Sequence, residues 1–135
     1  MVDKVVDASA LAALLFGEPE AAFVAGQISG ASLIAPALLD FELANVCRTK
    51  CRRHPDQEAS LVAAFLLRAR LGVRELAVDL DRVVELANQA GLTGYDASYL
   101  WLSSELEAEL VTLDAQLAKA AATLRQARGR PSRGS

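Results

Sequence analysis

The sequence predicts an α/β domain in which a short parallel sheet is covered on both faces by helices. Short apolar runs alternate along the chain with segments of helical spacing, which is typical of parallel strands joined by crossover helices. Alanine (26) and leucine (22) supply most apolar residues while aromatic residues make up only 5%, so helices and not a β-sandwich build the core. The 135 residues correspond to one domain with its own core.

The first segment follows the order strand, turn, helix. Residues 4–6 form a short β-branched run that ends at Asp7, and residues 8–16 then take helical spacing and stop at Gly17. Pro19 suits the first turn of a second helix, which we expect to end near residue 27.

The middle of the chain contains a second strand and a predicted αα-hairpin. Residues 32–35 form a short apolar strand, and Pro36 is expected to open a longer helix that reaches Arg53. Asp56 is a natural N-cap for a second helix, which ends before Gly72.

The last third of the chain repeats the alternation of strands and helices. The expected elements are a strand at 73–78, a helix to residue 90 capped by Asp79 or Asp81, a helix at 95–107, a strand at 110–113 and a helix at 115–126. We expect the folded domain to span residues 1–126. The Gly, Pro, Ser and Arg content of residues 127–135 predicts a disordered tail.

The net charge of −3 conceals a more acidic body. Four of the 14 basic residues lie at or after Arg125, whereas all 17 acidic residues precede it. This distribution excludes a broadly basic surface that neutralises phosphates. The sequence shows neither a signal-peptide pattern nor a membrane span, so we expect a cytoplasmic protein with reduced cysteines.

Four acidic residues are expected to meet at one edge of the sheet. Asp7 follows the first strand, Asp114 follows the last strand, and Asp96 lies in the first turn of the helix before that strand. Glu42 lies in the helix after the second strand, where it interrupts an apolar surface that includes Phe41. Ligands of open parallel sheets bind at the carboxyl ends of the strands, so these four residues form the candidate site.

Carboxylates gathered in this way need a cation. Two of them 4 Å apart repel each other by about 4 kcal/mol at an effective dielectric constant of 20, and no basic residue is placed to compensate. Mg²⁺ or Mn²⁺ binds carboxylate oxygens, activates water and polarises phosphoryl oxygens, as phosphodiester hydrolysis requires. Ser9, Asn45 and Thr112 are suited to orient ligands or waters beside such an ion.

Four segments resemble, in order, the acidic motifs of PIN domains, and specifically those of the VapC ribonuclease toxins of bacterial toxin–antitoxin pairs. The segments are VVDASALAALL, FELANV, GYDASYLWL and LVTLDAQLAKAA, and the resemblance covers about residues 2–124. It implies a PIN-like three-layer α/β/α domain with a short parallel central sheet and an αα-hairpin insertion. One departure is that related chains usually finish with a strand, whereas here a polar Arg-containing tail follows the last helix.

The resemblance also implies a function and partners. The chain would be a Mg²⁺-dependent endoribonuclease, and a homodimer neutralised by a cognate VapB-like antitoxin whose C-terminal segment covers the active site in a hetero-oligomer. The implied catalytic and metal-binding residues are Asp7, Glu42, Asp96 and Asp114.

Basic residues cluster around the predicted hairpin. They form either a solvated rim or an edge that steers RNA towards the acidic pocket. The candidates for this steering are Arg48, Lys50, Arg52 and Arg53, followed by Arg68, Arg70 and Arg74.

Two other functions fit parts of the pattern. An Asp that ends the first strand is also the nucleophile in phospho-aspartate phosphatases and receiver domains, although Ser9 stands where dehalogenase-like enzymes carry a second Asp. The acidic cluster also suits a non-catalytic module that docks an arginine of a partner. Cys47, Cys51 and His54 lack a fourth zinc ligand at suitable spacing, so we interpret the cysteines as reduced.

Overall fold

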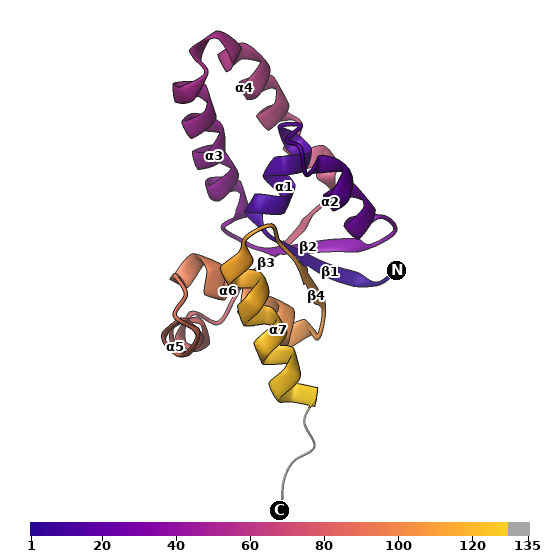
Figure 1. Cartoon of the computed structure of the whole chain (residues 1–135), viewed down its shortest axis with the longest axis vertical. Coiled ribbons are helices and arrows are strands. Elements are labelled where there is room, and N and C mark those ends of the chain that lie inside the picture. Colours follow the sequence, from indigo (N-terminus) through magenta and orange to yellow (C-terminus); the bar gives the residue numbers. More distant parts are fainter. Residues whose placement is uncertain (130–135) are drawn as a thin grey trace, which may run out of the picture.

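Four parallel strands form the central layer of the fold. In the computed structural model, which describes residues 1–129, they are arranged in the order β3-β2-β1-β4 (Figure 1). Their bounds are β1 (Asp3–Val6), β2 (Ser32–Pro36), β3 (Arg74–Leu76) and β4 (Glu109–Val111). β1 pairs with both β2 and β4, so it lies inside the sheet and its last residues, Val5 and Val6, are fully buried.

Helices cover both faces of this sheet. α1, α2 and α3 lie on one side, and α5, α6 and α7 lie on the other (Figure 1). The helices are α1 (Ala8–Leu15), α2 (Ala21–Ile28), α3 (Leu39–Arg53), α4 (Glu58–Leu66), α5 (Leu80–Ala90), α6 (Gly94–Leu106) and α7 (Ala115–Gly129), with short 3₁₀ helices at Pro55–Gln57 and Arg68–Leu71. The predicted three-layer α/β/α fold with a short parallel sheet is therefore confirmed.

The predicted αα-hairpin is formed by α3 and α4 and projects beyond the sheet layers (Figure 1). α3 buries Leu43 and Cys47, whereas α4 buries none of its residues completely. The Cys47 thiol packs against α4, with Sγ 3.7 Å from the carbonyl oxygen of Leu61. The hairpin is thus attached to the core through its first helix.

The core consists mainly of aliphatic side chains between the sheet and the two helical layers. Fully buried examples are Leu11 on α1, Val24 on α2, Ile34 on β2 and Leu117 on α7. Tyr99 on α6 is the largest of the fully buried side chains. The small residues of α1 and α6 allow the helices to approach the sheet closely.

Two predicted helix starts are wrong. Pro36 ends β2 instead of opening α3, which begins at Leu39. Pro36 pairs with Leu76 of β3, and the next N–H, that of Ala37, donates a hydrogen bond to the Leu76 carbonyl at 3.0 Å. Asp56 does not cap α4: it lies inside a 3₁₀ turn, and Gln57 precedes α4 without a side-chain cap. Asp79 does cap α5, since its Oδ1 accepts a hydrogen bond from the Arg82 N–H at 3.3 Å.

The C-terminal boundary also differs from the expectation. α7 continues to Gly129, so residues 127–129 of the expected tail are helical, while residues 130–135 lie outside the described part of the chain. No strand follows α7 within residues 1–129, and β4 forms an edge of the sheet. Within the same residues, no helix has both the length and the apolar character required to cross a membrane.

The buried position of Leu11 yields a stability prediction. Replacing the fully buried Leu11 by alanine leaves a cavity beneath the sheet, so we expect Leu11→Ala to reduce the free energy of unfolding by about 2–5 kcal/mol. Urea unfolding followed by circular dichroism measures this loss. The matched control is Leu80→Ala, because Leu80 is exposed on α5 and should change stability by less than about 0.5 kcal/mol. Equal losses in both variants would contradict the described core.

Candidate active site

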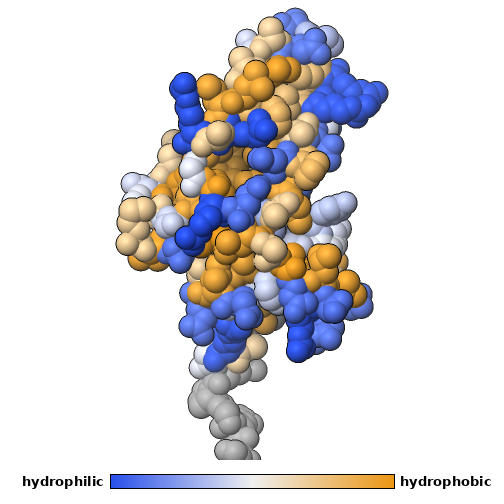
Figure 2. All heavy atoms as spheres, turned by 180° about the vertical axis from the view of Figure 1, so that it is seen from behind, coloured by the Kyte–Doolittle hydropathy of each residue, from blue (hydrophilic) through white to orange (hydrophobic). Residues whose placement is uncertain are grey.

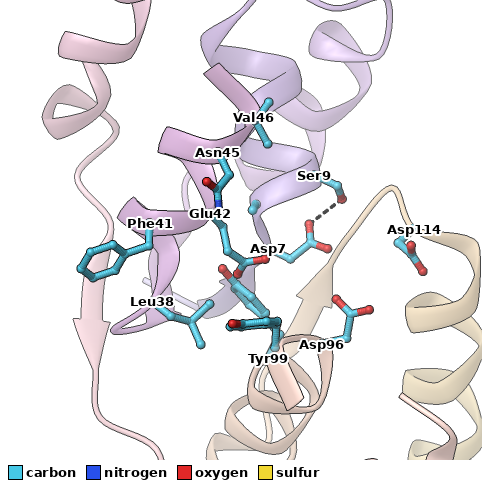
Figure 3. Close-up of a pocket in the computed structure, with 12 residues that line it drawn as sticks. Asp7, Ser9, Leu38, Phe41, Glu42, Asn45, Val46, Asp96, Tyr99 and Asp114 are labelled. Atoms are coloured by element: carbon cyan, nitrogen blue, oxygen red, sulfur yellow. Dashed lines mark hydrogen bonds between the residues drawn. The ribbon is translucent and has the colours of Figure 1, made fainter. Parts of the chain in front are cut away.

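An open pocket of about 710 Å³ lies at the carboxyl ends of β1 and β4. Its walls come from the start of α1, the first half of α3, the start of α6 and the residue before α7 (Figure 3). Twelve residues line it: Asp7, Ala8, Ser9, Leu38, Phe41, Glu42, Asn45, Val46, Tyr95, Asp96, Tyr99 and Asp114. All four predicted carboxylates therefore face one cavity.

Asp7 lies at the junction of β1 and α1 and is only 4% exposed. Its Oδ1 accepts hydrogen bonds from the Ala10 N–H at 3.0 Å and the Ser9 hydroxyl at 2.7 Å, and its Oδ2 accepts one from the Thr112 hydroxyl at 2.5 Å. Burial raises the pKa of Asp7, and these hydrogen bonds offset part of the increase. The side chain is both the N-cap of α1 and a wall of the pocket.

Two of the predicted supporting residues hold Asp7 in place. The Ser9 hydroxyl also accepts a hydrogen bond from the Leu113 N–H at 3.0 Å, which ties α1 to the segment after β4. Thr112 does not line the pocket, but it reaches the site through its bond to Asp7. Asn45, the third supporting residue, is exposed on the pocket wall.

Glu42 lies in the first turn of α3 and points into the pocket (Figure 3). Its Oε1 is buried without a hydrogen-bond partner, and so is the nearby hydroxyl of Tyr99. Burial raises the pKa of Glu42, the adjacent Tyr99 hydroxyl lowers it although the two groups are not aligned for a hydrogen bond, and the charges of Asp7 and Asp96 raise it further. An unpartnered buried carboxylate oxygen is costly, so this atom is available to a water or a cation.

Asp96 and Asp114 form the other side of the site (Figure 3). Asp96 is half-buried at the start of α6, and burial together with the charges of Asp114 and Asp7 raises its pKa. Asp114 is exposed, and its Oδ1 accepts a hydrogen bond from the Leu117 N–H at 2.8 Å at the start of α7. Asp7 and Asp114 therefore each accept a capping hydrogen bond at the start of a helix, and both also line the pocket.

The four carboxylates have no basic partner. The ion pairs formed within residues 1–129 are Lys4–Glu109, Lys50–Glu18, Arg68–Asp40 and Arg82–Glu85. None of them involves a pocket carboxylate. Mutual repulsion at this site is thus not relieved by the described protein residues.

The pocket suits a hydrated divalent cation. Among residues 1–129, no three acidic, cysteine or histidine side chains converge closely enough to enclose one ion. Mg²⁺ usually retains several waters and takes only one or two protein carboxylates, so an open acidic pocket fits it. The unpartnered Oε1 of Glu42 and the raised pKa values of Asp7, Glu42 and Asp96 also favour a cation here.

The predicted RNA-steering residues are separated from the pocket. Lys50 forms an ion pair with Glu18, its Nζ lying 2.7 Å from Glu18 Oε1, and the same Nζ lies 5.7 Å from the centre of the Phe16 ring. Arg48, Arg52 and Arg53 are exposed on the later turns of α3 and do not line the pocket. They remain candidates only for contacts beyond the site.

Sequence reasoning missed two exposed aromatic rings. Phe41, which we expected on a buried surface, is 77% exposed, and Tyr95 is 65% exposed. Both line the pocket, and each directly precedes a pocket carboxylate, Glu42 or Asp96. That adjacency is the sequence signal that would have identified them.

The cysteine and histidine cluster has no part in the pocket. Cys47 and Cys51 are free thiols, and His54 is an exposed residue at the end of α3. They do not form a metal site within the described residues.

Comparisons with known proteins agree with this architecture. A family model described as "PIN domain" matches residues 4–123. The crystal structure of PAE2754 from Pyrobaculum aerophilum is similar, with a TM-score of 0.70 and 26% sequence identity over 94% of this chain and 98% of that chain. A search of curated proteins gives no match.

The electrostatics of Glu42 predict a pH-dependent stability in metal-free buffer. Folding raises the pKa of Glu42 above its ordinary value of 4.5, so the folded state binds the proton more tightly than the unfolded state does. The free energy of unfolding therefore falls as the pH rises from 4.5 through the raised pKa. We therefore expect Glu42→Gln to raise Tm by a few degrees at pH 7 in EDTA. This gain should disappear below the ordinary pKa, where Glu42 is protonated in both states.

Thermal unfolding followed by circular dichroism at a series of pH values tests this expectation. Asp56→Asn is the control, because Asp56 is exposed and outside the pocket, and its variant should show no such gain. A lower Tm for Glu42→Gln at pH 7 would show that the carboxylate is stabilised by the folded protein.

Proposed function

We propose that this chain, which belongs to the PIN-domain family, is a divalent-metal-dependent endoribonuclease that hydrolyses RNA phosphodiester bonds. PIN domains are generally nucleases, which supports RNA as the substrate. The single observation that carries the proposal is the pocket itself: four carboxylates line one cavity, and within residues 1–129 no basic side chain pairs with any of them. A cation relieves their repulsion and brings a phosphate to the site.

We assign the cation to Asp7, Asp96 and Asp114, which would hold it partly through the waters that the ion retains, with Glu42 as a further ligand or as the group that positions water. When bound, Mg²⁺ or Mn²⁺ would supply charge stabilisation at the phosphate and increase the acidity of a water. The hydroxyl donors Ser9 and Thr112 hold Asp7 in one orientation, so its carboxylate is pre-arranged.

The residues of the chain also suit the hydrolytic step. Glu42 Oε1 has no protein partner and can accept a hydrogen bond from the attacking water. The water oxygen forms a bond to phosphorus and releases a proton to the solvent of the open pocket. The bond from phosphorus to one ribose oxygen breaks, and that oxygen takes up a proton from the same solvent. Because the pocket is open, an internal segment of an RNA chain can lie across it, and neither end of the RNA has to enter first.

The phospho-aspartate alternative receives less support from the same geometry. Ser9 stands where dehalogenase-like enzymes carry a second Asp, and its hydroxyl donates a hydrogen bond to Asp7 Oδ1 at 2.7 Å. The position thus supports the orientation of Asp7 and supplies no second carboxylate. The docking alternative requires an arginine to enter the pocket, and it predicts that metal does not bind.

Asp96→Asn tests the nuclease proposal. We expect purified wild-type protein to cut a mixture of cellular RNAs in Mg²⁺ or Mn²⁺ and not in EDTA, and Asp96→Asn to reduce the rate by about 100-fold or more. Cleavage is measured as fragments on a denaturing gel, and metal binding by calorimetric titration.

Asp56→Asn is the matched control, since it removes an exposed carboxylate outside the pocket and should retain the wild-type rate. Cleavage that persists unchanged in EDTA would refute the metal mechanism. Failure to bind either ion at millimolar concentration would favour the docking role.

We further propose that the nuclease is the cytoplasmic toxin of a toxin–antitoxin pair, a homodimer neutralised by a VapB-like antitoxin. The support is the resemblance of its four acidic motifs to VapC toxins, together with unusually exposed apolar side chains. Val62 and Leu66 on α4, and Leu67 after it, are exposed, and Figure 2 shows apolar surface interrupted by charged side chains. Exposed apolar patches of this kind are typical of protein-binding surfaces.

Controlled expression in a bacterial host tests the toxin proposal. We expect the wild-type protein to arrest growth and Asp7→Asn, at equal cellular amounts, to permit it. The proposal predicts a neighbouring reading frame that encodes a small VapB-like protein, and co-expression of that protein should restore growth and yield a complex that co-purifies. Growth that continues normally at high levels of active nuclease would refute the toxin role while leaving the nuclease proposal intact.

A further inference from the structure

We infer that Phe41 and Tyr95 stack on unpaired bases of the RNA on either side of the scissile phosphate, and so restrict the enzyme to unpaired RNA. This inference rests on the proposed nuclease function and extends it to the form of the substrate. Both rings belong to the pocket that contains the carboxylates, but they lie at its exposed rim.

The distribution of aromatic residues sets these two rings apart. The chain has only seven aromatic residues, and three of them, Phe23, Phe41 and Tyr95, are mostly exposed. Two of these three line the pocket, on helices that face each other across it, α3 and α6. Leaving a large ring in water forfeits the free energy of its burial, so a covering ligand is favoured.

The orientation of neighbouring side chains separates two roles within the pocket. In Figure 3, Glu42 points towards the other carboxylates, whereas Phe41, one residue earlier on α3, points away from them. A base that covers the Phe41 ring therefore lies beside the acidic centre and not on top of it. This arrangement leaves the centre open to the phosphate.

Charge favours bases over phosphates as the groups bound at this rim. The pocket contains four carboxylates and no lysine or arginine, so the protein itself offers the RNA backbone no attraction there. Stacking on an aromatic face does not depend on phosphate charge and is available to every base. The exposed amide of Asn45, on the same wall as Phe41, can in addition form hydrogen bonds with the edge of a base.

The consequence is a preference for unpaired RNA. In a duplex the faces of the bases are covered by their neighbours, and recognition of RNA sequence generally uses unstacked bases in loops and single strands. A rim that binds through two ring faces must therefore select segments whose bases can leave the stack.

Binding measured without catalysis tests this inference. The probe is a fluorescein-labelled 12-nucleotide single-stranded RNA of mixed sequence, titrated in the presence of Ca²⁺, an ion that carboxylate oxygens bind, with anisotropy as the readout and a denaturing gel to show that the RNA stays intact. We expect Phe41→Leu and Tyr95→Leu each to weaken binding about 5- to 100-fold, the range for losing one stacked base. Phe41→Trp should retain or strengthen binding, because it keeps an aromatic face.

Three controls identify the cause of any loss. Phe23→Leu changes an exposed phenylalanine outside the pocket and should leave binding unchanged. The dependence of affinity on salt should be the same for wild type and Phe41→Leu, because no phosphate contact is removed. The same RNA annealed to its complement should bind wild-type protein weakly, and Phe41→Leu should affect that binding little.

The possible results separate the inference from the proposed function. Wild-type cleavage with unchanged RNA affinity in both leucine variants would overturn stacking and leave the nuclease proposal standing. Tight, Phe41-dependent RNA binding without cleavage in Mg²⁺ or Mn²⁺ would support stacking and overturn the nuclease proposal. A change of oligomeric state in the leucine variants, with RNA affinity unchanged, would show that the rings contact protein and not RNA.

Discussion

The buried carboxylate of Asp7 links the fold to the site. It lies where β1 meets α1, caps the helix through the Ala10 N–H, and receives the Thr112 hydroxyl from the segment that follows β4. Ser9 completes the arrangement by bonding to both Asp7 and the Leu113 N–H. Because a buried carboxylate is tolerated only with such donors, α1 and the end of β4 must keep these positions. The edge of the sheet that carries the other acids is thereby fixed as well.

The same edge concentrates negative charge that the rest of the domain does not neutralise. Burial and neighbouring acids raise the pKa values of Asp7, Glu42 and Asp96. The ion pairs of the described residues all use acidic side chains outside the pocket. The folded protein thus carries an unfavourable interaction that a cation would remove. Local destabilisation of this kind is a recurrent property of functional sites, where stability is lost in return for binding.

This division of charge explains how an acidic protein can act on a nucleic acid. In the proposed arrangement the carboxylates handle phosphate through a cation, the rings of Phe41 and Tyr95 contact bases, and the exposed Arg48, Arg52 and Arg53 lie farther along α3. Net charge therefore excludes only a broadly basic binding surface. It carries no information about a site that approaches phosphate through a metal ion.

The sequence by itself determined the alternation of strands and helices and the position of the four carboxylates, because strand ends are marked locally and parallel strands bring their carboxyl ends together. It could not reveal that Lys50 pairs with Glu18 or that Thr112 bonds to Asp7. Each of these depends on which distant segment lies opposite a side chain. Phe41 lies on the opposite side of α3 from the buried Leu39 and Leu43, and the packing of the three layers left that side of the helix uncovered. Only the tertiary structure decides such matters, since contacts between distant segments arise when the layers assemble.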